Sequence, residues 1–143
     1  MSIPAILLPV FVQVALTFAL LLWTGSRRLR AVRGGEVRVA DVSMGERNWP
    51  APAQQAANTF ANQFEIPVLF LVLVPLAIVT RKADLLFVVL SWLFVLTRYV
   101  HAGIYLTTNR VPLRFGAFLA GVVVLAFMWI VFAVRILAGP WPA

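Results

Sequence analysis

Four long apolar runs, separated by polar segments, constrain this chain more than any other feature of its sequence. The first run, Ile3 to Thr24, carries no charged residue over about 22 positions, which is roughly 33 Å of helix and enough to cross the hydrocarbon core of a bilayer. The chain is 62% hydrophobic and 12% charged, whereas soluble domains are about 25% charged. These proportions exclude a soluble enzyme, a disordered tail and a nucleic-acid-binding module, and they predict an integral membrane protein.

The runs predict a single membrane domain over residues 1–143 with four spans. The expected spans cover about residues 3–24, 53–80, 85–107 and 113–137. The last three spans are joined by tight turns, so successive helices should be antiparallel. Pro67 and Pro75 should each remove a hydrogen bond from the second span and kink it. We therefore predict an all-α, up-down, four-transmembrane-helix bundle, with residues 25–52 as its long loop.

The distribution of basic residues predicts the orientation of the bundle. The net charge is +7, and six arginines fall in the long loop. They are Arg27, Arg28, Arg30, Arg33, Arg38 and Arg47. Arg110 and Arg114 add to the same side, while the opposite side holds Arg81, Lys82 and Arg135. The positive-inside rule then predicts a multi-pass membrane protein with a cytoplasmic long loop and both termini non-cytoplasmic. The charge is interpreted as a topology signal, with the lipid bilayer and not nucleic acid as the partner.

Metal and thiol chemistry on the protein itself is disfavoured by composition. The chain has no cysteine, one histidine and five acidic residues. Disulfides, thiolate metal sites and a protein thiol nucleophile are therefore excluded, and we expect no metal site.

Two stripes of polar residues fall inside the second and third spans. The first stripe consists of Asn58, Asn62 and Glu65, and the second of Arg98, His101 and Tyr105. Their spacings place each set on one face of a helix, about 40° and 60° wide. Glu65 should lie roughly 10 Å, and Arg98 roughly 13 Å, from the cytoplasmic end. Because the depths match, we expect the stripes to meet.

Ionisable groups at this depth cost about 2.5–3.5 kcal/mol each to insert, which makes a functional role the first interpretation. A buried Glu65–Arg98 ion pair that only fixes helix packing is the alternative. The convergence of these polar groups beside an arginine-rich loop favours a half-buried, positively charged pocket that opens to the cytoplasm. Such a pocket suits an anionic, water-soluble ligand that meets a hydrophobic small-molecule substrate in the lipid phase.

These residues resemble the membrane-associated proteins in eicosanoid and glutathione metabolism, the MAPEG family, over nearly the whole chain. Asn62 and Glu65 match its second-helix pattern Arg-x-x-x-Asn-x-x-Glu, with Asn58 at the arginine position. The third helix resembles the prostaglandin E synthase type in Arg98-x-x-His101-x-x-x-Tyr105, and the following turn in Arg110-x-Pro-x-Arg114. Phe118 occupies the position of a tyrosine in that type.

The resemblance implies a four-helix bundle that forms a homotrimer and holds glutathione between subunits near the cytoplasmic face. Arg114 would then be the catalytic residue that stabilises the glutathione thiolate. The implied glutathione-binding residues are Arg28, Asn58, Asn62, Glu65, Arg98, His101, Tyr105 and Arg110.

The expected function is a membrane-embedded glutathione transferase or peroxidase-like enzyme that acts on hydrophobic electrophiles or lipid hydroperoxides. The alternative is a non-catalytic membrane scaffold or lipid-binding protein of the same fold. A small cation-coupled transporter, which would also use one intramembrane glutamate, is disfavoured because Arg98 at matching depth would keep Glu65 ionised.

Overall fold

A computed structural model describes residues 1–45 and 48–138, and every regular element in these ranges is a helix. Residues 46–47 of the predicted loop and 139–143 of the predicted domain lie outside the described ranges. The long helices are α1 (Ile3–Arg33), α2 (Ala51–Ala61), α3 (Ile66–Val79), α4 (Leu85–Leu106) and α5 (Val111–Leu137). Two short 3-10 helices, η1 (Val39–Val42) and η2 (Asn62–Phe64), complete the described elements.

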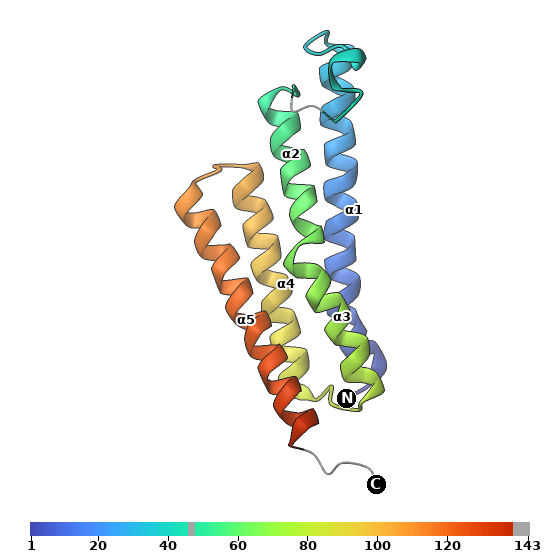
Figure 1. The fold of residues 1–143 in the computed structure, drawn as a ribbon, viewed down its shortest axis with the longest axis vertical. Coiled ribbons are helices and arrows are strands. Elements are labelled where there is room, and N and C mark those ends of the chain that lie inside the picture. The colour runs from blue at the N-terminus through green and yellow to red at the C-terminus, as the bar shows by residue number, and fades with distance from the viewer. Residues whose placement is uncertain (46–47, 139–143) are drawn as a thin grey trace.

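The helices form two packed hairpins (Figure 1). One hairpin pairs α1 with α2, η2 and α3, and the other pairs α4 with α5, while α1 also contacts α4. Four stretches are long and apolar enough to cross a membrane, namely Ile3–Arg33, Ala51–Val79, Leu85–Leu106 and Val111–Leu137. The predicted all-α, four-span architecture is confirmed.

Helix α1 continues beyond the predicted end of its span at Thr24, into what the sequence suggested was loop, and stops at Arg33. A helix-ending hydrogen bond from Gly34 N to Arg30 O, 2.8 Å long, follows, and Gly35 adopts a positive φ of 71°. A residue without Cβ adopts this left-handed conformation at little cost, so the glycines end the helix. The α1–α2 hairpin consequently projects beyond the α4–α5 turn (Figure 1).

The second span is interrupted at η2 and Glu65. Glu65 has φ −92° and ψ −117°, and α3 begins directly after it, with Pro67 in its first turn. Proline has no N–H to donate to the carbonyl of Gln63, so the α-helical ladder breaks here. The kink predicted at Pro67 is confirmed, whereas α3 continues through Pro75.

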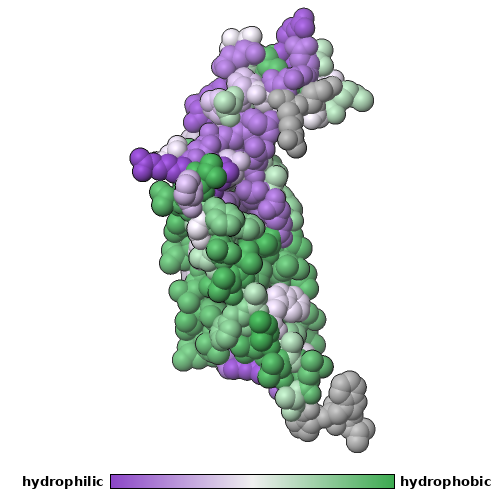
Figure 2. Space-filling model, turned by 60° about the vertical axis from the view of Figure 1, so that its left-hand side comes forward, coloured by the Kyte–Doolittle hydropathy of each residue, from purple (hydrophilic) through white to green (hydrophobic). Residues whose placement is uncertain are grey.

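The buried core lies in the half of the bundle that contains α3. The rings of Phe70 and Phe94 are 4.9 Å apart between centroids, and Met128 of α5 and Ile6 of α1 close around them. On the face shown in Figure 2 this half is mostly apolar, with a large hydrophilic region at one end and a small one at the other. The long loop and the α4–α5 turn share the strongly hydrophilic end (Figure 1). Which side of the membrane this end faces stays a prediction.

Candidate functional site

The second half of α4 carries the stripe that the sequence predicts, and α5 completes it. His101 is 4% exposed, and its ring centroid lies 6.1 Å from that of Tyr105 and 6.0 Å from that of Phe118 on α5. Tyr105 is half-buried one turn nearer the helix end. Helical spacing therefore places His101 and Tyr105 in the seam between α4 and α5.

Arg114, in the first turn of α5, lies directly over this seam. Its guanidinium carbon is 4.1 Å from the centroid of the Tyr105 ring, a cation–π distance. Its Nη1 donates a 2.7 Å hydrogen bond to Oδ1 of Asn109. Asn109 has a positive φ of 47°, and its N–H donates to Ile104 O at 2.8 Å, so the turn itself aims its side chain at Arg114. This role of Asn109 was not predicted from the sequence. An asparagine in a tight turn before Pro112 is nevertheless a recognisable signal of a left-handed backbone conformation.

Arg98 lies deeper in the same seam, where its guanidinium donates hydrogen bonds to backbone carbonyls. It is 2% exposed, and Nη2 donates to the carbonyls of Ala117 and Phe118 at 3.2 and 3.3 Å. Its guanidinium carbon also lies 5.5 Å from the Phe118 ring centroid and 5.6 Å from that of Phe94. This arrangement couples α4 to α5.

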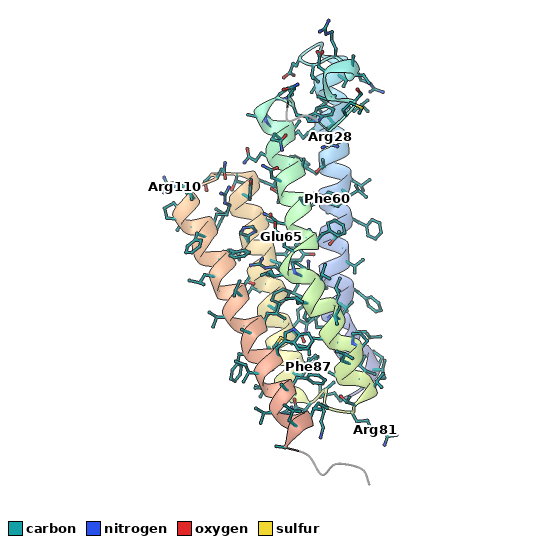
Figure 3. The ribbon with its side chains drawn as sticks, in the orientation of Figure 1. Arg28, Phe60, Glu65, Arg81, Phe87 and Arg110 are labelled. Atoms are coloured by element: carbon teal, nitrogen blue, oxygen red, sulfur yellow. The ribbon has the colours of Figure 1, made fainter. Side chains whose placement is uncertain are left out.

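The Glu65–Arg98 ion pair, which was the alternative to a functional role, is not formed. Among the described residues, the ion pairs within 4 Å are Arg38–Asp41 and Arg135–Asp84. The expectation assumed one continuous helix through Glu65, but the break at η2 turns its side chain outward, where it is exposed. Figure 3 shows Glu65 at this break.

Gln63, which lies outside the predicted stripe, turns inward instead of Glu65. It accepts a 2.9 Å hydrogen bond from Nε2 of Gln13 on α1 and donates to Thr59 O at 3.2 Å. Gln55 of α2 donates to the carbonyl of Tyr105 and so joins α2 to α4. The polar contacts of Gln13, Gln55 and Gln63 between spans are therefore made by uncharged side chains.

Arg28 and Asn58 belong to a different surface, between α1 and α2. They line an open groove of about 550 Å³ whose other lining residues include Phe60 and Phe64. The guanidinium carbon of Arg28 lies 4.9 Å from the Trp49 ring centroid, and Asn58 Oδ1 accepts from Gln54 Nε2 at 2.7 Å. Figure 3 labels Arg28 and Phe60 on this hairpin, and Arg110 on the other.

The predicted site residues thus separate into two groups within one chain. His101, Tyr105, Arg114 and the buried Arg98 form the α4–α5 group, whereas Arg28 and Asn58 form the α1–α2 group. Half-buried Asn62 and exposed Glu65 lie at the break, and Arg110 is exposed at the start of α5.

Basic side chains predominate at this end of the bundle. In the long loop, Arg38 holds Asp41 in a 2.9 Å ion pair, and the hydrogen bond from Arg38 lowers the pKa of that carboxyl. The described residues contain no cluster of three or more His, Cys, Asp or Glu side chains suited to a metal ion. Arginine side chains are suited to binding carboxylates.

Comparison with known proteins identifies one family. Residues 6–134 match the MAPEG family. No curated protein and no solved structure matches the chain.

Proposed function

Since this chain belongs to the MAPEG family, which includes glutathione transferases and peroxidases, we propose that it is a membrane-embedded, glutathione-dependent enzyme. Its proposed activity is that of a transferase or a peroxidase-like enzyme on hydrophobic electrophiles or lipid hydroperoxides. The observation that carries the proposal is Arg114, fixed by Asn109 above the Tyr105 ring at the strongly hydrophilic end of the bundle.

Arg114 supplies the catalytic electrostatics in this proposal. A thiol with a pKa near 8.5 is mostly protonated at pH 7, and a neighbouring guanidinium favours its ionised form. The thiol proton leaves to solvent, and the thiolate forms a carbon–sulfur bond to the electrophilic carbon of a lipid-soluble substrate while the leaving group departs with its bonding electron pair. With a lipid hydroperoxide the thiolate attacks one oxygen and breaks the O–O bond, which gives the lipid alcohol after protonation and the sulfenic acid of glutathione; a second glutathione then forms the disulfide and water. The half-buried position of Arg114 strengthens its effect because low-dielectric surroundings screen the charge less than water does.

The remaining predicted residues are proposed to hold the tripeptide. Arg28 and Arg110 suit its carboxylates, Glu65 suits its ammonium group, and Asn58 and Asn62 suit its backbone amides. His101 and Tyr105 line the same seam as Arg114 and would border the reacting sulfur.

A homotrimer would explain the separation of the two groups. The groove with Arg28 and Asn58 lies on the α1–α2 hairpin, so a neighbouring copy could set it against the α4–α5 group. The large apolar outer surface of α5 supports such an assembly, because only 17% of its spanning window is buried within one chain.

The test is glutathione binding and thiolate formation by purified protein in detergent. Wild type should bind glutathione and shift it toward thiolate, and Arg114→Ala should lose the thiolate. Lys82→Ala, which removes a positive charge at the opposite end, is the matched control and should behave as wild type. Absence of both binding and thiolate in the wild type would overturn the proposal.

The second candidate is a non-catalytic scaffold or lipid-binding protein. The burial of Arg98 and its hydrogen bonds to α5 favour it, because they serve helix packing without any ligand. It predicts that Arg98→Ala lowers thermal stability while no variant affects thiol chemistry.

A further inference from the structure

The end of the bundle opposite the candidate site carries a group of cations around the turn between α3 and α4. Arg81, Lys82 and Arg135 line an open pocket of about 470 Å³ together with Asp84. Figure 3 labels Arg81 at this end of the bundle, far from Arg28 and Arg110. Three cationic side chains thus face a single carboxylate.

The carboxylate of Asp84 already has an ion-pair partner and a hydrogen-bond donor. Asp84 Oδ2 lies 2.7 Å from Arg135 Nη2, and Asp84 Oδ1 accepts a 3.0 Å hydrogen bond from the backbone N–H of Phe87. Arg135 Nη1 also donates to the carbonyl of Lys82 at 3.5 Å, which fixes α5 against the turn. Neither Arg81 nor Lys82 takes part in an ion pair among the described residues. The pocket therefore keeps an excess of positive charge.

The turn that presents these cations is itself well defined. Arg81 adopts a positive φ of 58°, and the N–H of Lys82 donates to Ala77 O at 2.8 Å. The N–H of Arg81 donates to Ile78 O at 3.0 Å. The backbone of two adjacent cationic residues is thus fixed where the spans leave the membrane.

An apolar crease between α4 and α5 begins at the same cations. Lys82 and Arg135 line it at its mouth, and its walls include Leu86, Leu90, Val131 and Phe132. Only about 10 Å³ of the crease is enclosed, room for about one water molecule, so an acyl chain would lie over its apolar walls and not inside it. A positively charged mouth over an apolar crease matches the two parts of an anionic lipid.

We propose that the crease between α4 and α5, with Arg81, Lys82 and Arg135 at its mouth, binds an anionic phospholipid in the leaflet opposite the candidate site. The phosphate contacts the cations, and one acyl chain lies along the crease toward the centre of the membrane. A free phosphate would make no use of the apolar walls, and a lipid without net charge would leave the excess positive charge uncompensated.

Native mass spectrometry of the detergent-solubilised protein tests this site. The probes are phosphatidylglycerol and phosphatidylcholine with identical acyl chains. Wild type should bind phosphatidylglycerol more tightly, and the double variant R81Q/K82Q should lose roughly 10- to 30-fold in affinity for it. Val131→Trp, which places a bulky ring over the wall of the crease and keeps every cation, should also lower that affinity.

A matched charge control is R30Q/R33Q, which removes two exposed arginines at the C-terminal end of α1, at the end of the bundle opposite this pocket. It should bind phosphatidylglycerol as the wild type does. Equal binding of both lipids by the wild type, or an equal loss in the control, would overturn the proposal. Displacement of the lipid by excess inorganic phosphate would also overturn it, because the site would then be one for a free anion. None of these measurements involves glutathione, so they are independent of the proposed enzymatic activity.

Discussion

Gly121 of α5 lies directly against the guanidinium of Arg98 on α4. A Cβ on Gly121 would lie 2.5 Å from Arg98 Nη2 and 2.6 Å from Thr97 Oγ1, closer than side chains approach one another. The glycine leaves the space in which Arg98 reaches the carbonyls of Ala117 and Phe118. The α4–α5 seam, with Arg114 at its open end, depends on this close approach.

Gly121→Ala should therefore destabilise the bundle although alanine favours helices. Displacing the buried Arg98 costs about 1–3 kcal/mol as overpacking, against a gain in helix propensity of at most about 1 kcal/mol. Gly116→Ala is the matched control, because nothing lies within 4 Å of a Cβ there, and it should be neutral or slightly stabilising. Thermal unfolding in detergent measures both, and a G121A protein as stable as G116A would contradict the expectation.

Asn109→Gly should weaken the action of Arg114 in the proposed enzyme without disturbing the turn. Glycine adopts the positive φ of Asn109 easily but lacks the Oδ1 that holds Arg114 Nη1. The pKa of the bound glutathione thiol should rise by up to about 1, toward that of a free thiol. The pH dependence of thiolate formation measures this, with Thr108→Gly as the control. If both glycine variants titrate alike, Asn109 does not position Arg114.

Gln13 and Gln63 should show energetic coupling. Gln13→Leu leaves the Gln63 amide oxygen without its donor in a buried position, at a cost of about 0.6–2 kcal/mol. The double variant Q13L/Q63L removes both partners and should cost less than the sum of the single variants. A double-mutant cycle on unfolding free energies measures the coupling, and strictly additive costs would argue against a stabilising bond.

The Asp84–Arg135 pair should make stability fall at acid pH. The hydrogen bond from Arg135 lowers the pKa of Asp84 below the ordinary value near 3.9. Its contribution is therefore complete above pH of about 4 and is lost as the pH falls through the lowered pKa. Because the side chains of Asp84 and Arg135 are 48% and 33% exposed, the effect should stay below about 1 kcal/mol.

Comparison of the wild type with Asp84→Asn from pH 6 to pH 3 isolates the contribution of the Asp84–Arg135 ion pair to stability. The amide keeps an acceptor for the N–H of Phe87 but carries no titrating charge. The stability difference between the two proteins should shrink as the pH falls. A difference that is constant with pH would mean that the ion pair contributes nothing.

The sequence by itself determined the helical membrane class and the number of candidate spans. Uncharged runs of sufficient length have no other stable environment than lipid, and helices satisfy their own backbone groups there. The predicted spans 85–107 and 113–137 lie close to the observed α4 and α5. The helical period likewise placed His101 and Tyr105 in one seam, because that part of α4 is regular.

Tertiary structure alone decided what the polar side chains contact. The prediction that Asn58, Asn62 and Glu65 share one face required a regular helix through all three. The helix instead breaks before Pro67, so that Glu65 points outward and Gln63 inward. Arg98 found its partners in carbonyls of α5 because Gly121 lets the two helices approach. Helical periodicity predicts the direction of a side chain only within one unbroken helix. Which residues that side chain contacts depends also on where each helix breaks and on how closely the helices pack.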